Sequence, residues 1–97
     1  MKAAHDVRRA AIWTREEAGS DAERRLVAAI DRAVRQLRRS PLSGSPRFGH
    51  RLGIPDLRCV VLERVPWTLF SVLTQAGIDV VRVLHQRSDI PRHLQER

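Results

Sequence analysis

The spacing of hydrophobic residues changes midway along the chain, and this change constrains the fold more than any other feature. Before residue 40, apolar side chains such as Leu26, Ile30 and Leu37 recur every three or four positions, as on one stripe of a helix. After residue 56, β-branched and aromatic residues come in short runs separated by Pro66 and by residues 74–77. The pattern predicts an α+β domain with helices first and strands second.

Two helices are predicted in the first half, over residues 3–18 and 21–39. Gly19 ends the first helix, and Ser20 with Glu23 forms a capping-box pattern, in which each side chain accepts a hydrogen bond from the other residue's backbone N–H. Ser40-Pro41 ends the second helix. The two helices are expected to pack as an antiparallel hairpin.

A loop is predicted over residues 40–56, where prolines and glycines are interspersed with serines. Three strands follow, over residues 57–65, 67–73 and 78–85, and they form an antiparallel meander. Residues 88–91 are predicted to turn, and the remaining residues to form a short tail.

The predicted sheet is apolar on both faces. In its first strand, alternation sets Leu57 and Cys59 on one side and Val60 on the other. Strict alternation in its third strand puts Ile78, Val80 and Leu84 on the side opposite Val83. Because a helix hairpin covers one face only, we expect a partner protein, a second copy, or the chain's own loop and tail to cover the other.

The length of 97 residues suits one domain, spanning residues 1–97, with one core. Its 18 basic residues outnumber 11 acidic ones, which gives a formal net charge of +7, and all but Lys2 are arginines. Arginine pairs two-pronged with carboxylates and phosphates, so the balance favours an acidic protein or nucleic acid as partner, although many arginines belong on solvated helix faces.

Neither a cofactor nor a metal site is expected. The single cysteine, Cys59, excludes an internal disulfide, and the four histidines lack the spacing of a ligand set. The glycines of residues 40–56 precede the sheet, which is the wrong context for a phosphate loop. No apolar run reaches the roughly 20 residues of a membrane span, and no signal-peptide pattern opens the chain, so we expect a cytoplasmic protein without membrane contact.

The end of the third strand is the one place where catalytic chemistry is conceivable. His85 there could act as a general base, with Arg87 supporting a phosphate. The alternative is structural, with His85 half-buried at the sheet edge and Asp89 capping the turn.

The order of several short motifs resembles the ParE/RelE superfamily of bacterial toxins. These motifs are Ala4-x-Asp6-Val7, Leu57-Arg58, Glu63-Arg64-Val65-Pro66-Trp67 and Val83-Leu84-His85-Gln86-Arg87-Ser88-Asp89-Ile90-Pro91. The last is similar to the V-L-H-x-x-R-D-x-P ending of the ParE branch. The resemblance covers nearly the whole chain.

The resemblance implies a helix hairpin packed on an antiparallel sheet, and a function as toxin of a type II toxin–antitoxin system. ParE-like toxins inhibit DNA gyrase without acting as enzymes. A ParD-like antitoxin neutralises them in a hetero-tetramer or larger assembly, and operator DNA is bound only through that antitoxin. The residues implied for target or antitoxin binding are Arg58, Arg64, Trp67, Phe70, Arg82, His85, Arg87 and Asp89.

The competing hypothesis is a RelE-type endonuclease that cuts mRNA on the ribosome. Its catalytic candidates would be His85, Arg87 and Arg58. Cys59, Val61 and Thr68 stand where that branch carries charged side chains, which argues against the chemistry. The short first strand of the family is apparently missing, so the sheet is expected to have an unpaired edge.

Overall fold

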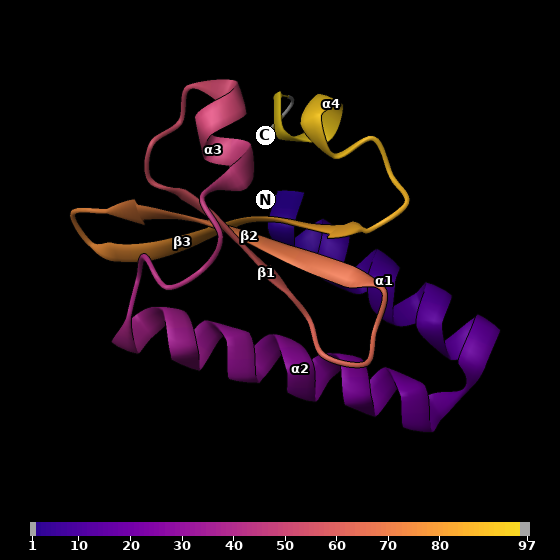
Figure 1. The fold of residues 1–97 in the computed structure, drawn as a ribbon. Helices are drawn as coiled ribbons and strands as arrows, with labels where there is room; N and C mark the ends of the chain where they lie inside the picture. The colour runs from indigo at the N-terminus through magenta and orange to yellow at the C-terminus, as the bar shows by residue number, and fades with distance from the viewer. Residues whose placement is uncertain (1, 96–97) are drawn as a thin grey trace.

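The structure, a computed structural model, describes residues 2–95 and has three layers (Figure 1). The elements in chain order are α1 (Lys2–Ala18), α2 (Ser20–Arg39), α3 (Arg47–Leu52), β1 (Leu57–Val61), β2 (Trp67–Thr74), β3 (Gly77–His85) and α4 (Ile90–Gln95). The α1–α2 hairpin lies on one face of the sheet, and α3 and α4 lie on the other. The predicted α+β class, with a helix hairpin on a three-stranded antiparallel sheet, is confirmed. None of the helices within residues 2–95 combines the length and apolar character that crossing a bilayer requires.

The helix hairpin reverses at Gly19, whose φ of 90° lies in a region that glycine adopts without strain. The predicted capping box is wrong, because α2 begins at Ser20 and no side chain caps its first turn. The Glu23 carboxylate instead accepts a hydrogen bond from Arg15 Nε of α1 at 3.0 Å. This ion pair ties the two helices together across the turn.

The sheet has the order β1-β2-β3, with both pairs antiparallel. The first strand ends at Val61 rather than at residue 65, because the chain turns through Arg64 with a φ of 63°. A bulge between β2 and β3 pairs Phe70 with Arg82 and Ser71 with Val80, so Val81 has no partner.

The bulge changes which way the end of β3 faces. Strict alternation predicted Leu84 on the same side as Ile78 and Val80, and this is wrong. Val83 packs with the core under the helices, and Leu84 packs in the opposite core. The extra residue shifts the alternation of side chains by one position, so residues after the bulge face the sides opposite to those that strict alternation gives them.

The core beneath the hairpin is built from small residues of α2 and larger ones of the sheet. Its buried members are Ala10, Leu26, Ala29, Ala33, Leu37, Leu62, Leu69 and Val83. Alanines at three positions let the helices approach the sheet closely. This core corresponds to the apolar stripe seen in the sequence.

The second face of the sheet is covered by the chain's own loop and tail, so no partner is required to fill it. The buried cluster there is Phe48, Leu57, Cys59, Phe70, Leu84, Ile90 and Leu94. The prediction of a loop throughout residues 40–56 is therefore wrong over Arg47–Leu52, and the predicted tail contains α4. Helices of six residues are too short to show a hydrophobic period.

Both edges of the sheet are partly protected. At β3, the Asp6 carboxylate of α1 accepts the outward Val83 N–H at 2.9 Å. At β1, Ser45 exchanges two backbone hydrogen bonds of 2.9 Å with Cys59. These contacts cover part of each edge, and the end of β1 beyond Cys59 has no such partner among the described residues.

Candidate functional site

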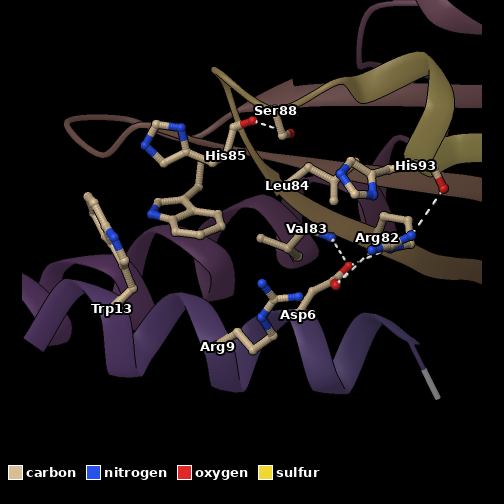
Figure 2. A pocket seen from close by; sticks show the side chains of 10 residues that line it. Asp6, Arg9, Trp13, Arg82, Val83, Leu84, His85, Ser88 and His93 are labelled. Atoms are coloured by element: carbon tan, nitrogen blue, oxygen red, sulfur yellow. Dashed lines mark hydrogen bonds and ion pairs between the residues drawn. The ribbon is translucent and has the colours of Figure 1, made fainter.

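An aromatic cluster of Trp13, Trp67 and His85 forms where β3 ends. Trp67 opens β2 directly opposite His85 in the sheet register, and Trp13 joins them from α1. The ring centroids lie 5.1 Å apart for Trp67–His85, 5.5 Å for Trp13–His85 and 6.0 Å for Trp13–Trp67. All three contacts are edge-to-face, the arrangement that aromatic rings prefer. Figure 2 shows Trp13 rising from its helix beside His85.

The aromatic cluster is open to solvent on one side. Trp13 is 44% exposed, which is unusual for so large an apolar side chain. The Nε1 donor of Trp67 is buried and has no hydrogen-bond acceptor among the described residues. A buried donor without an acceptor costs stability.

His85 is fixed by the turn that follows it. Its Nδ1 accepts the Arg87 N–H at 3.1 Å. Its carbonyl accepts the Ser88 hydroxyl at 2.6 Å (Figure 2). The Nδ1 lone pair is therefore occupied, which leaves Nε2 as the ring atom available to a partner. The same hydrogen bonds hold Arg87 on the surface beside the ring.

A shallow hollow borders the aromatic cluster and contains the cation Arg87. Pro66 and Gln86 complete its lining. Tryptophan and arginine are the side chains most enriched at the energetic centres of protein interfaces. The composition of the hollow suits recognition of another macromolecule.

A recess of about 210 Å³ adjoins the aromatic cluster on the side of α1. Inside it, Arg82 donates to both carboxylate oxygens of Asp6, from Nε at 2.6 Å and from Nη2 at 3.0 Å. The third guanidinium nitrogen donates to the carbonyl of His93 at 3.0 Å (Figure 2). Because the charge of Arg82 is compensated and buried, this side chain is part of the framework, and Arg9 is the exposed cation of the recess.

Of the residues predicted for binding, the structure brings Trp67, His85 and Arg87 together at this surface. Phe70 is fully buried and packs edge-to-face on Phe48 with centroids 5.6 Å apart, so it contributes to the core. Asp89 is exposed at the start of α4, where its carboxylate lies 3.4 Å from the Arg92 backbone nitrogen.

Arg58 and Arg64 lie elsewhere. Arg58 pairs with Ser71 in the sheet, four residues along β2 from the partner of His85. Its Nη1 donates to the carbonyls of Pro55 at 2.8 Å and Leu57 at 3.0 Å. Arg64 is exposed at the tip of the β1–β2 turn. The three catalytic candidates of the endonuclease hypothesis, His85, Arg87 and Arg58, are therefore not gathered at one site.

Sequence reasoning missed Trp13 and Arg9 as members of this surface. Trp13 recurs at helical spacing with Val7 and Ala10, and that spacing alone does not distinguish a core residue from a surface residue. A bulky tryptophan among such small residues was the available signal. Its contact with residues 54 and 72 positions later depends on the packing of α1 against the end of β3, which no local pattern encodes.

Chemistry based on thiols or metals finds no support in residues 2–95. No group of three or more potential metal ligands occurs among them. Burial raises the pKa of the Cys59 thiol, and a hydrogen bond with Ser45 and the nearby charge of Arg47 offset this only in part. Cys59 therefore behaves as a neutral core side chain.

Residues 1–90 match the family model described as "ParE toxin of type II toxin-antitoxin system, parDE". A solved structure described as "Chromosomal ParDE TA system from P. aeruginosa" has the same fold, with a TM-score of 0.70, 22% sequence identity and 87% of each chain covered. Comparison with curated proteins gives no match. The family match spans the helix hairpin, the sheet and the aromatic cluster, and the chain therefore belongs to the ParE toxin family of type II toxin–antitoxin systems.

Proposed function

We propose that this ParE-family toxin acts in the cytoplasm by binding and inhibiting DNA gyrase through the aromatic cluster and Arg87. The observation that carries the proposal is the 44% exposed Trp13, which packs on His85 and Trp67 beside a surface arginine. Exposed tryptophan and arginine on a rigid framework provide a binding epitope, and the sheet and α1 supply that rigidity.

Binding is favoured over RNA cleavage by the arrangement of charges. Cleavage of a phosphodiester needs cations around the scissile phosphate. Arg58 is engaged with backbone carbonyls away from His85, and the charge of Arg82 is neutralised by Asp6. Arg87 is the cation that lines the hollow beside His85, and Arg9 is the exposed cation of the adjoining recess. This arrangement of separate surface cations suits anchors for a protein better than an active site.

A ParD-like antitoxin is the proposed inhibitor of the toxin, within a hetero-tetramer or larger assembly. The net charge of +7 favours an acidic partner and accelerates its association. In this arrangement the antitoxin alone contacts operator DNA, and no cofactor takes part.

The test is a supercoiling assay with purified gyrase and purified toxin. We expect inhibition by the wild type, and a loss of at least about tenfold in potency for Trp13→Ala or Arg87→Ala, as for central interface residues. Ile12→Ala is the matched control, because Ile12 is 52% exposed on the same helix and does not line the hollow. Unimpaired supercoiling at saturating toxin would reject the proposal.

A second measurement separates the two functions in cells. Induction of the toxin alone should give filamentous cells with DNA damage, and co-expression of the antitoxin should restore growth. Cleavage of ribosome-bound mRNA by the wild type, absent with His85→Ala, would instead establish the endonuclease.

A further inference from the structure

Two arginines accompany the exposed ring of Trp13, one in the recess and one in the hollow. Arg9 lines the recess and Arg87 lines the hollow, while Trp13 lines both. Arg9 precedes Trp13 by four residues on α1, so the two side chains are neighbours on one face of the helix, and Figure 2 shows both rising toward the end of β3. Both arginines are exposed, and neither guanidinium forms an ion pair with another described residue.

No free carboxylate balances these two cations where they lie. Among the described residues that line the recess and the hollow, the acidic one is Asp6, and its carboxylate is already occupied by Arg82 and the Val83 N–H. Because Nδ1 of His85 accepts a hydrogen bond, the neutral ring has its proton on Nε2 and offers a further donor. The surface around Trp13 therefore selects an anionic ligand.

The exposed apolar part of the same surface is largely aromatic. Val83 and Leu84 of the recess are buried, so a ligand meets the rings of the aromatic cluster, with Pro66 beside them. Aromatic rings next to arginines are typical of sites for single-stranded nucleic acid, because each base stacks on a ring while its phosphates pair with the cations. An unpaired base suits such a ring, since the bases of a duplex are stacked on one another.

We propose that this surface binds a single strand of DNA. An unpaired base stacks on Trp13, and the phosphates on its two sides pair with Arg9 in the recess and with Arg87 in the hollow. The recess, at about 210 Å³, is large enough to admit a phosphate group. The choice of DNA over RNA rests on the proposed function, because gyrase acts on DNA, whereas strand binding itself requires no gyrase.

The phosphate contacts are tested by the salt dependence of binding. The anisotropy of a fluorescein-labelled oligothymidylate dodecamer is measured during titration with toxin at several NaCl concentrations. Each neutralised phosphate of a single strand contributes about 0.7 to the slope of log affinity against log salt concentration, so Arg9→Gln and Arg87→Gln should each reduce the slope by about 0.7. Arg25→Gln removes the same charge at an exposed position of α2 that lines neither the recess nor the hollow, and it should leave the slope unchanged. Equal slopes for all three variants would overturn the proposal.

The stacking contact is tested separately from the charges. Trp13→Ala should weaken binding at least about fivefold, the lower end of what one base stacked on an aromatic side chain contributes, and should leave the salt slope unchanged. Ile12→Ala is the control, because Ile12 is 52% exposed on the same helix and lines neither the recess nor the hollow. Unaltered affinity of Trp13→Ala would contradict stacking.

Tryptophan fluorescence reports the same contact directly, because the chain has two tryptophans. In Trp67→Phe the signal comes from Trp13 alone, and a stacked base should quench it in a saturable way. A duplex of the same length should quench it less, since its bases are paired. Thermal unfolding checks that each variant is folded, and the anisotropy of the wild type decides the matter if Trp67→Phe is not.

The outcomes separate the inference from the proposed function. Inhibition of gyrase by a toxin that binds no strand would overturn the inference alone, and strand binding by a toxin that leaves supercoiling unimpaired would reject the proposed function alone. Displacement of the strand by an octaglutamate peptide whose binding depends on Trp13 and Arg9 would assign the surface to an acidic protein segment instead. Tighter binding of the corresponding RNA strand would overturn the choice of DNA.

Discussion

At the scale of single residues, Asp6 combines a charged group with nearly complete burial. Its carboxylate is buried and accepts three hydrogen bonds, two from Arg82 and one from the Val83 N–H. A buried ion pair is tolerated because further hydrogen bonds satisfy both partners, as the carbonyl of His93 does for Arg82. Removing one partner leaves the other as an uncompensated charge.

We therefore expect Asp6→Asn to destabilise the fold by about 3 kcal/mol, the loss typical of a broken buried pair. The measurement is equilibrium unfolding in urea. Asp21→Asn, which removes the exposed pair with Arg24, should leave the midpoint unchanged within error. Equal effects of the two substitutions would show that the buried pair contributes no more than a surface one.

Cys59 gives a prediction about pH. Burial raises its pKa, so the folded state holds the thiol proton more tightly than the unfolded state does. This contribution to stability is complete below the ordinary thiol pKa and is lost as the pH rises toward the raised value. The free energy of unfolding of the wild type should fall more steeply between neutral and alkaline pH than that of Cys59→Ala. Parallel curves would contradict the raised pKa.

At the scale of elements, the sequence predicted well what is long and periodic. The two helices and three strands follow from hydrophobic spacing, because each buries a continuous stripe or face. The six-residue helices α3 and α4 were missed because less than two turns cannot show a period. The bulge at Val81 was missed because an extra residue leaves no mark on an uninterrupted apolar strand.

The residues of the candidate site divide in the same way, into those that local patterns reveal and those whose place depends on packing. Trp67, His85 and Arg87 were implied by the family resemblance, and His85 with Arg87 also followed from their place at and just after the end of a recognisable strand. Trp13 was missed because its role depends on how α1 packs against β3. Phe70 was misassigned because a fully buried and a partner-facing aromatic look alike in a strand that is apolar on both faces.

The position of α3 depends on Gly49, which gives a prediction at this scale. A β-carbon there would lie 2.5 Å from the carbonyl oxygen of Ile54 and 3.0 Å from that of Leu57. Gly49→Ala should therefore displace α3 and cost about 1–3 kcal/mol in urea unfolding, as overpacking usually does. His50→Ala, at an exposed position of the same helix, is the control and should be neutral. Unchanged stability of Gly49→Ala would mean that α3 packs loosely.

At the scale of the whole molecule, two surfaces at opposite edges of the sheet differ in their side chains. The aromatic cluster lies where β3 ends beside α1. A separate groove, lined by Ala29 and Ala33 of α2 and by Val60 of β1, lies at the opposite edge of the sheet. The two surfaces share no lining residue. The described chain thus has two physically separate surfaces.

The net charge of +7 predicts how salt changes the rate at which the antitoxin associates. Long-range attraction accelerates association, and salt screens it, so the association rate constant should fall about tenfold between 20 and 200 mM NaCl. The dissociation rate constant should change much less, because it reports contacts already made. Stopped-flow mixing measures both. An association rate that ignores salt would show that the excess charge plays no part in recognition.

The Asp6–Arg82 pair joins α1 to β3 across a separation of 76 residues. During synthesis the acidic partner therefore remains without its cation until the residues up to Arg82 have been made. A fragment released before Arg82 is made would have to bury a lone carboxylate to pack the helix hairpin on the sheet. Such fragments should therefore remain unfolded and be degraded by proteases. The hairpin-on-sheet fold is therefore expected to form only after β3 has been synthesised.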